Sequence, residues 1–187
     1  MIAAEVMAGL AMGFVIQIAF AAALVAGEAI SNAMGLGFAS MADPASGQSS
    51  PAVGQFLSML TMFLFLAADG HLALIATIAD SYRALPPGAA WLSFSAFGNI
   101  VKFGSLAFTA GLSIALPVGF ALVLVQLIMA MIARSAPTLN LFAVGMPAAL
   151  LAGILLLGVS MPVMADLLSN ALRLALDQAQ AIGGGRG

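Results

Sequence analysis

The chain has 187 residues, of which 63% are hydrophobic and 6% are charged, whereas about a quarter of an average soluble domain is charged. Such a composition excludes a soluble enzyme, and five Lys and Arg residues cannot form the basic face that nucleic acid requires. The absence of cysteine excludes disulfides, thiolate metal sites and cysteine nucleophiles. The sequence therefore predicts an integral membrane protein with one domain, over residues 1–187, of roughly four to six spans.

Long uncharged stretches divide the chain. They cover residues 6–27, 44–68, 103–133 and 135–165, and each is long enough to cross a bilayer, which takes about 20 apolar residues. Their apolar residues do not alternate strictly with polar ones, and backbone in lipid must form hydrogen bonds within the protein. We therefore predict an all-α fold of helical hairpins, with about four long kinked helices and a C-terminal amphipathic helix.

In chain order, the first helix is predicted from about residue 3 to 40. Its start does not resemble a signal peptide, because Glu5 stands where such a peptide has basic residues. A loop rich in Pro, Gly and Ser follows over 41–51. The second helical region is predicted over 52–83, with an interruption near Asp69-Gly70-His71.

Proline marks the later breaks and bends. Leu85-Pro86-Pro87-Gly88 is predicted to be a turn, because a proline disfavours helix at the residue before it. A third helix is expected over 95–134 with a kink at Pro117, and a fourth over 138–165 after a break at Ser135-Ala136-Pro137. Two further prolines lie inside the fourth helix, at Pro147 and Pro162.

Residues 166–182 have a different pattern. Their polar residues recur at helical spacing: Asp166, Asn170, Arg173 and Asp177. Apolar residues occupy the other face: Leu168, Leu172, Ala175 and Ala179. This pattern predicts an amphipathic helix that lies on a membrane surface or against a partner.

Small residues recur every four positions along the first helix. This ladder consists of Ala19, Ala23, Gly27, Ser31 and Gly35. Small side chains let two helix backbones approach closely, which favours helix association in a membrane. Ordinary richness in Ala and Gly is the alternative, but five members in register favour a packing face.

A polar seam is predicted on the same helix. It consists of Gln17, Glu28 and Asn32, and Lys102 is the cation at the edge of a helix that could meet Glu28. An ionised side chain at membrane depth is costly, so it is expected to face protein or water and to be paired. Two interpretations remain open, a buried structural pair and a seam that lines a conduit.

Catalytic chemistry has little support in the sequence. His71 is the single histidine, and neither H-E-x-x-H nor G-x-S-x-G occurs. We therefore expect no enzyme activity, no cofactor and no metal site.

The loop over 41–51 is the remaining candidate. Pro44 and Pro51 bracket a flexible centre at Gly47, and Asp43 precedes them. Irregular backbone near a membrane persists where it is buried in protein or lines a wet cavity. The loop is therefore either an exposed surface loop or a plug.

Several motifs, taken together and in order, resemble the FliR family of flagellar biosynthesis proteins and the export-gate T proteins of type III secretion. In the N-terminal half they are Gly27-Glu28-Ala29-Ile30, Met34-Gly35-Leu36-Gly37-Phe38-Ala39, Asp43-Pro44 with Gly47, Gly70-His71 and Leu85-Pro86-Pro87-Gly88. In the C-terminal half they are Ala115-Leu116-Pro117, Arg134-Ser135-Ala136-Pro137, Leu139-Asn140 and Val144-Gly145-Met146-Pro147. The resemblance extends from about residue 5 to 165. Members of this family usually begin with additional apolar helices, so we expect this chain to be N-terminally short.

The resemblance implies a protein export gate in the bacterial inner membrane, at the flagellar basal body. The family assembles with FliP and FliQ into a closed helical ring, next to FlhB and FlhA, through which unfolded flagellar subunits pass. It also implies that the loop over 41–51, with Asp43, Pro44, Gly47 and Pro51, is a plug in that channel. Two other functions stay open, a small ion-coupled transporter with Glu28 as its proton site and a purely structural membrane-assembly protein.

Overall fold

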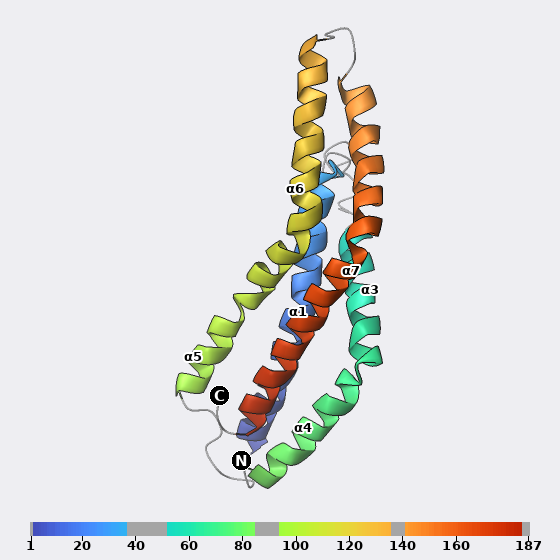
Figure 1. Ribbon diagram of the computed structural model, residues 1–187. Helices are drawn as coiled ribbons and strands as arrows, with labels where there is room; N and C mark the ends of the chain where they lie inside the picture. The colour runs from blue at the N-terminus through green and yellow to red at the C-terminus, as the bar shows by residue number, and fades with distance from the viewer. Residues whose placement is uncertain (1, 37–51, 85–93, 136–140, 185–187) are drawn as a thin grey trace, which may run out of the picture.

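The computed structural model describes residues 2–36, 52–84, 94–135 and 141–184 (Figure 1). Every secondary-structure element in these ranges is a helix, which confirms the all-α prediction. The helices are α1 (Ile2–Ala33), α3 (Ala52–Ala67), α4 (Gly70–Ala84), α5 (Phe94–Phe103), α6 (Leu106–Ser135) and α7 (Leu141–Gly183).

Helix α1 is the centre of the arrangement. It packs against α3, α6 and α7, while α4 packs against α7 (Figure 1). Helices α6 and α7 run antiparallel, and together they extend beyond α1 at one end. The start of α1 and the end of α7 lie together at the opposite end. A helix in this central position needs an apolar surface on most of its sides, and α1 has one.

Two clusters of buried side chains hold the helices together. One surrounds the C-terminal half of α1 and joins Ile30 to Leu57 of α3, Leu122 of α6 and Leu168 of α7. The other surrounds the N-terminal half of α1 and includes Val15, Phe65 of α3, and Ala175 and Ala179 of α7. Each end of α1 is therefore packed against a different part of α7.

Helix α1 ends earlier than predicted, at Ala33 and not near residue 40. Gly35 adopts a left-handed backbone conformation with φ of 80°. The amide of Leu36 donates to the carbonyl of Ser31 at 3.0 Å, and the amide of Gly35 donates to Asn32 at 3.0 Å. These two bonds and the left-handed glycine form a Schellman cap, which ends a helix by satisfying its last carbonyl groups.

A side chain from α6 completes this cap. The Gln126 side-chain amide (Nε2) donates to the Ala33 carbonyl at 2.7 Å, although the two residues are 93 positions apart. Gln126 is one of few polar residues in an otherwise apolar helix. It therefore stabilises the end of α1 and fixes its position along α6.

Replacing Gln126 with Leu is expected to lower the free energy of unfolding by about 1 kcal/mol, because the Ala33 carbonyl loses its donor. Thermal unfolding in detergent would measure the change. Gln55→Leu is the control, because Gln55 is exposed on α3. Equal effects of the two substitutions would contradict a role for the bond.

The predicted interruption near Asp69 is confirmed. Helices α3 and α4 meet at an angle of 64°. Asp69 lies between them with φ of 53°, a conformation that Asp tolerates better than most residues. Its carbonyl accepts from the amide of Ala73 at 3.0 Å, so Asp69 is the N-cap residue of α4.

The predicted third helix is two helices. A turn at Gly104 and Ser105 separates α5 from α6, and the Gly104 amide bonds to the carbonyls of both Ile100 and Val101 at 3.1 Å. The Ser105 hydroxyl donates to the Lys102 carbonyl at 2.8 Å and so satisfies the end of α5. Pro117 lies inside α6, which changes direction along its length in Figure 1.

The predicted fourth helix and the amphipathic helix are one helix, α7, which contains both Pro147 and Pro162. A proline removes one backbone hydrogen bond but ends a helix only where nothing else holds the chain in register. Residues on both sides of Pro162 pack against other helices, with Leu157 partly buried before it and Leu168 fully buried after it. The expected turn over 85–88 and the break over 136–137 lie outside the described residues.

Three stretches are long and apolar enough to cross a membrane: Glu5–Ala33, Gly98–Ser135 and Gly145–Gly183. The bent pair of α3 and α4 makes a fourth if it is counted as one broken span. Counted in this way, four spans agree with the lower end of the predicted range of four to six spans.

Candidate functional site

The predicted plug residues Asp43, Pro44, Gly47 and Pro51 lie outside the described residues. The structure describes the chain up to Leu36 and again from Ala52. Leu36 packs at the edge of the cluster around the C-terminal half of α1. The other candidate residues can therefore be located, but the loop between these points stays a prediction.

The ladder of α1 faces other helices of the same chain. Gly27 lies directly against the backbone of Val53 and Gly54 in the first turn of α3. A Cβ atom added to Gly27 would be 2.8 Å from the carbonyl carbon of Val53 and closer still to the Cα of Gly54. The contact therefore requires glycine, because no side chain fits between the two backbones.

The other members of the ladder occupy different environments. Ala19 and Ala23 have no exposed surface, and Ser31 is 5% exposed. Gly35 lies beyond the last turn of α1, where it forms the cap described above and is partly exposed. Four members thus pack inside the chain, while the fifth ends the helix.

Sequence reasoning missed the glycines of other helices that pack closely against α1 and its C-terminal cap. Gly54 meets Gly27, and a Cβ on Gly111 of α6 would lie 2.9 Å from the Ala22 carbonyl oxygen. A Cβ on Gly153 of α7 would lie 2.6 Å from the Met34 side chain. None of these three glycines has another glycine three or four positions away on its helix, so no repeat revealed them.

The polar seam residues of α1 are all exposed. Gln17, Glu28 and Asn32 point away from the helices that pack on α1. The Asn32 side-chain amide donates to the Glu28 carboxylate at 3.5 Å, the distance of a weak hydrogen bond. These residues therefore belong to an outer face of this chain.

Lys102 is not close to Glu28, contrary to the predicted pair. It lies in the last turn of α5, and its neighbours Val101 and Gly104 line a groove with Phe14 of α1. Phe14 and Glu28 are 14 positions apart, which is about 20 Å along a helix. In the parts of the chain that the structure describes, the ion pair is between Arg83 and Asp80, at 3.1 Å and exposed. The interpretation as a buried Glu28–Lys102 pair is therefore wrong.

The two faces of residues 166–182 separate as their pattern predicts. Asp166, Asn170, Arg173 and Asp177 are exposed. Leu168, Leu172, Ala175 and Ala179 are each no more than 4% exposed. This apolar face packs within the chain, mainly against the N-terminal half of α1, and does not lie on a membrane surface.

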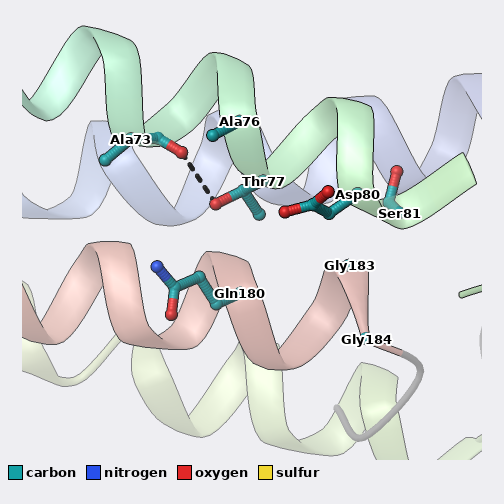
Figure 2. Close-up of a pocket in the computed structure, with 8 residues that line it drawn as sticks. All are labelled: Ala73, Ala76, Thr77, Asp80, Ser81, Gln180, Gly183 and Gly184. Carbon is teal, nitrogen blue, oxygen red and sulfur yellow. Dashed lines mark hydrogen bonds between the residues drawn. The ribbon is translucent and has the colours of Figure 1, made fainter. Parts of the chain in front are cut away.

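A groove of about 370 Å³ lies between α4 and the end of α7 (Figure 2). Thr77, Asp80 and Ser81 approach it from α4, and Gln180 faces them from α7. The Thr77 hydroxyl donates to the Ala73 carbonyl at 2.9 Å and the Ser81 hydroxyl to the Ile78 carbonyl at 2.7 Å. Because both hydroxyls are bonded to their own helix, neither is prepared as a nucleophile.

Metal-binding side chains are dispersed. Within the described ranges, no three His, Asp or Glu residues come close enough to hold a metal ion. His71 lies in the first turn of α4.

The surface is the most informative feature. Large apolar side chains cover the outside of α6 and α7, with Val159 80% exposed, Met131 72% and Phe120 66%. A soluble protein rarely exposes so large a continuous apolar surface. The fold therefore defines an all-α membrane protein whose helices present apolar faces on their outer sides.

Comparison with known proteins gives the family. A family model described as bacterial export proteins, family 1, matches residues 1–175. The flagellar biosynthetic protein FliR of Escherichia coli (strain K12) is 41% identical over 161 residues, which cover 86% of this chain and 62% of that protein. FliR of Pectobacterium carotovorum subsp. carotovorum is 40% identical over 158 residues (84% and 60%), and FliR of Bacillus subtilis (strain 168) 30% over 179 (92% and 68%).

The chain therefore belongs to bacterial export proteins, family 1, with FliR proteins as its relatives. It spans about 60% of the length of the first two relatives.

Proposed function

We propose that this protein is a component of the flagellar type III protein export gate and that it forms the export channel together with FliP and FliQ. The observation that carries the proposal is the family match over residues 1–175, with relatives that are named flagellar biosynthetic proteins. The protein is then located in the bacterial inner membrane at the flagellar basal body, beside FlhA and FlhB. Its substrates are unfolded flagellar subunits, and it transfers them without catalysis of its own.

The exposed surface supports a role in an assembly. The ends of α6 and α7 that extend beyond α1 lie beside each other, and both helices expose many large apolar side chains. Polar residues also remain on the outside of α1, at Gln17, Glu28 and Asn32. Lipid suits the first surface but not the second, because polar groups at membrane depth need polar partners. A subunit of a larger helical complex accounts for both.

Complementation combined with purification tests the proposal. We expect the gene to restore motility to a bacterium that lacks its own FliR, and the tagged protein to purify from those membranes with FliP and FliQ. If the tagged protein is abundant in the membrane but purifies without FliP and FliQ, and motility is absent, the proposal is wrong.

A plug at Met41–Pro51 gives a separate prediction. Deleting residues 46–50 is expected to leave the complex assembled but to make the membrane leaky to ions and small solutes, because a loop segment rich in Gly and Ser can act as a displaceable barrier. Conductivity of cells or uptake of a small impermeant dye would measure the leak. Normal permeability in cells that contain the complex would show that this loop is not the barrier.

A further inference from the structure

Helix α4 is held against its neighbour by small polar side chains. The buried side chains that the structure describes on α4 are Thr77 and Ser81, which are 8% and 2% exposed. Large apolar side chains of α4 are instead on the outside, with Leu72 54% and Ile75 62% exposed. Because large buried side chains supply most of the contacts that hold one helix on another, the contact of α4 with α7 is a weak one.

The face of α4 that meets α7 is also hollow. The groove of about 370 Å³ described above lies between Thr77, Asp80 and Ser81 on α4 and Gln180 on α7 (Figure 2). The hydroxyls of Thr77 and Ser81 donate to carbonyls of α4 itself, so neither hydroxyl donates to α7. Leu74, nearer the start of α4, packs at the edge of the cluster around the N-terminal half of α1. The later turns of α4 therefore rest on α7 through few strong contacts.

Helix α3, by contrast, is fixed on α1. Gly27 and Gly54 bring the two backbones into direct contact. Leu57 has no exposed surface and belongs to the cluster around the C-terminal half of α1, while Phe65 belongs to the other cluster. A helix that is packed in this way cannot follow a movement of α4. Any such movement is therefore absorbed at the break between α3 and α4.

The backbone at this break is strained. Among the described residues other than glycine, Asp69 alone has a positive φ, 53°, which is the left-handed region that is costly for residues with a Cβ atom. Its amide donates to the Leu66 carbonyl at 3.1 Å, a tighter pattern than that of an α-helix. Gly70 lies on the ring of Phe65, where an added Cβ would be 2.5 Å from two ring carbons. One strained residue and one glycine contact thus hold the bend of 64°.

We propose that α4 is a pivoting arm that swings about Asp69 and Gly70. In the bent state seen here it closes against the end of α7 (Figure 1). In the extended state it leaves α7, opens the groove and continues α3 as one helix. The extended state loses a weak contact and gains helical backbone bonds and relief of the strain at Asp69. Together the two helices are long and apolar enough for one membrane span. The arm goes beyond the proposed function and does not depend on it.

Two substitutions at Asp69 separate a pivot from a rigid bend. Asp69→Gly and Asp69→Ala both remove the carboxylate, so they differ only in their effect on the backbone. Glycine adopts positive φ readily and favours the bent state, whereas alanine resists positive φ and favours a continuous helix. We expect the ratio of extended to bent molecules to be at least about tenfold higher in Asp69→Ala than in Asp69→Gly.

A single thiol on α4 reports this ratio. The chain has no cysteine, so Ser81→Cys is labelled alone by a water-soluble maleimide. Ser81 is 2% exposed, so its thiol reacts only while α4 is away from α7. On the full chain in native membranes, we expect labelling to be at least about tenfold faster in Asp69→Ala than in Asp69→Gly. Tyr82→Cys, at a position that is 53% exposed, controls for access of the reagent and is expected to react equally in both.

Equal labelling of Ser81→Cys in the two backgrounds, with Tyr82→Cys reactive in both, would overturn the pivot. Ala171→Cys guards against a general loosening of the fold. Ala171 is 2% exposed and belongs to the cluster around the N-terminal half of α1, so we expect it to stay protected in both backgrounds. If Asp69→Ala accelerates the labelling of Ala171→Cys by the same factor, the whole chain has loosened and the pivot is wrong.

A disulfide between α4 and α7 gives a second arm of the test. A Cβ at Gly183 would lie 3.5 Å from the Ser81 Cβ, and the two Cβ atoms of a disulfide are about 3.5–4.5 Å apart. Ser81→Cys combined with Gly183→Cys is therefore expected to crosslink on mild oxidation in the bent state. We expect this crosslink to form more slowly in Asp69→Ala than in Asp69→Gly, opposite to the maleimide reaction. A crosslink that forms equally fast or faster in Asp69→Ala would contradict the pivot.

Discussion

Gly27→Leu is expected to prevent stable folding. Gly27 touches the backbone of Gly54, and even one added carbon would lie 2.8 Å from the carbonyl carbon of Val53. Backbone atoms in two packed helices cannot move aside as a flexible side chain can. The substitution must therefore push α3 away from α1 and disrupt the buried cluster that contains Ile30 and Leu57.

We expect the loss to reach about 3 kcal/mol or more, the upper part of the range for overpacked cores. That is a large share of the stability of a typical domain. The amount of folded protein in detergent, measured by size-exclusion chromatography and thermal unfolding, would show it. Gly158→Leu is the matched control, because a Cβ at Gly158 meets nothing within 4 Å. Normal stability of the Gly27→Leu protein would mean that α1 and α3 do not pack as described.

Leu168→Ala is expected to have the second largest effect. Leu168 has no exposed surface and joins α7 to the cluster around the C-terminal half of α1. Removing its side chain leaves a cavity that rigid neighbouring helices cannot fill, and such changes typically cost about 2 to 5 kcal/mol. The part of α7 that follows Pro162 is then expected to pack less tightly against the rest of the chain.

Leu174→Ala on the same helix provides the control. The chemical change is identical, but Leu174 is 42% exposed, so we expect a loss below about 1 kcal/mol. Thermal unfolding of the two variants in the same detergent would compare them directly. Similar melting temperatures would indicate that the C-terminal part of α7 is not packed against α1.

Part of the candidate site was predictable from local patterns. The faces of residues 166–182 follow from the spacing of Asp166, Asn170, Arg173 and Asp177, because a helix turns by a constant angle at each residue. Small residues at Ala19, Ala23 and Gly27 indicated a packing face in the same way. The helix they contact was not predictable, since its contribution is a single glycine, Gly54.

Other expectations failed at residues whose type can have either of two structural roles. Gly35 continues the four-residue spacing of the ladder, but glycine is also the residue that caps a helix, and in the structure it has that second role. Proline has the same ambiguity. Pro162 was expected to lie near the end of a helix, yet α7 continues past it because the following turns are buried against α1.

The sequence by itself determined the properties that depend on neighbouring residues: an all-α membrane protein, the break at Asp69 and Gly70, and the buried side of residues 166–182. These follow from apolar periods and from the cost of charge in lipid. The tertiary structure alone decided which distant residues meet. Gln126 reaches Ala33 across 93 positions, while Glu28 and Lys102 stay apart. The reason is geometric, because a helix carries residues away from one another at a fixed rise, and only the packing of whole helices determines which side chains face each other.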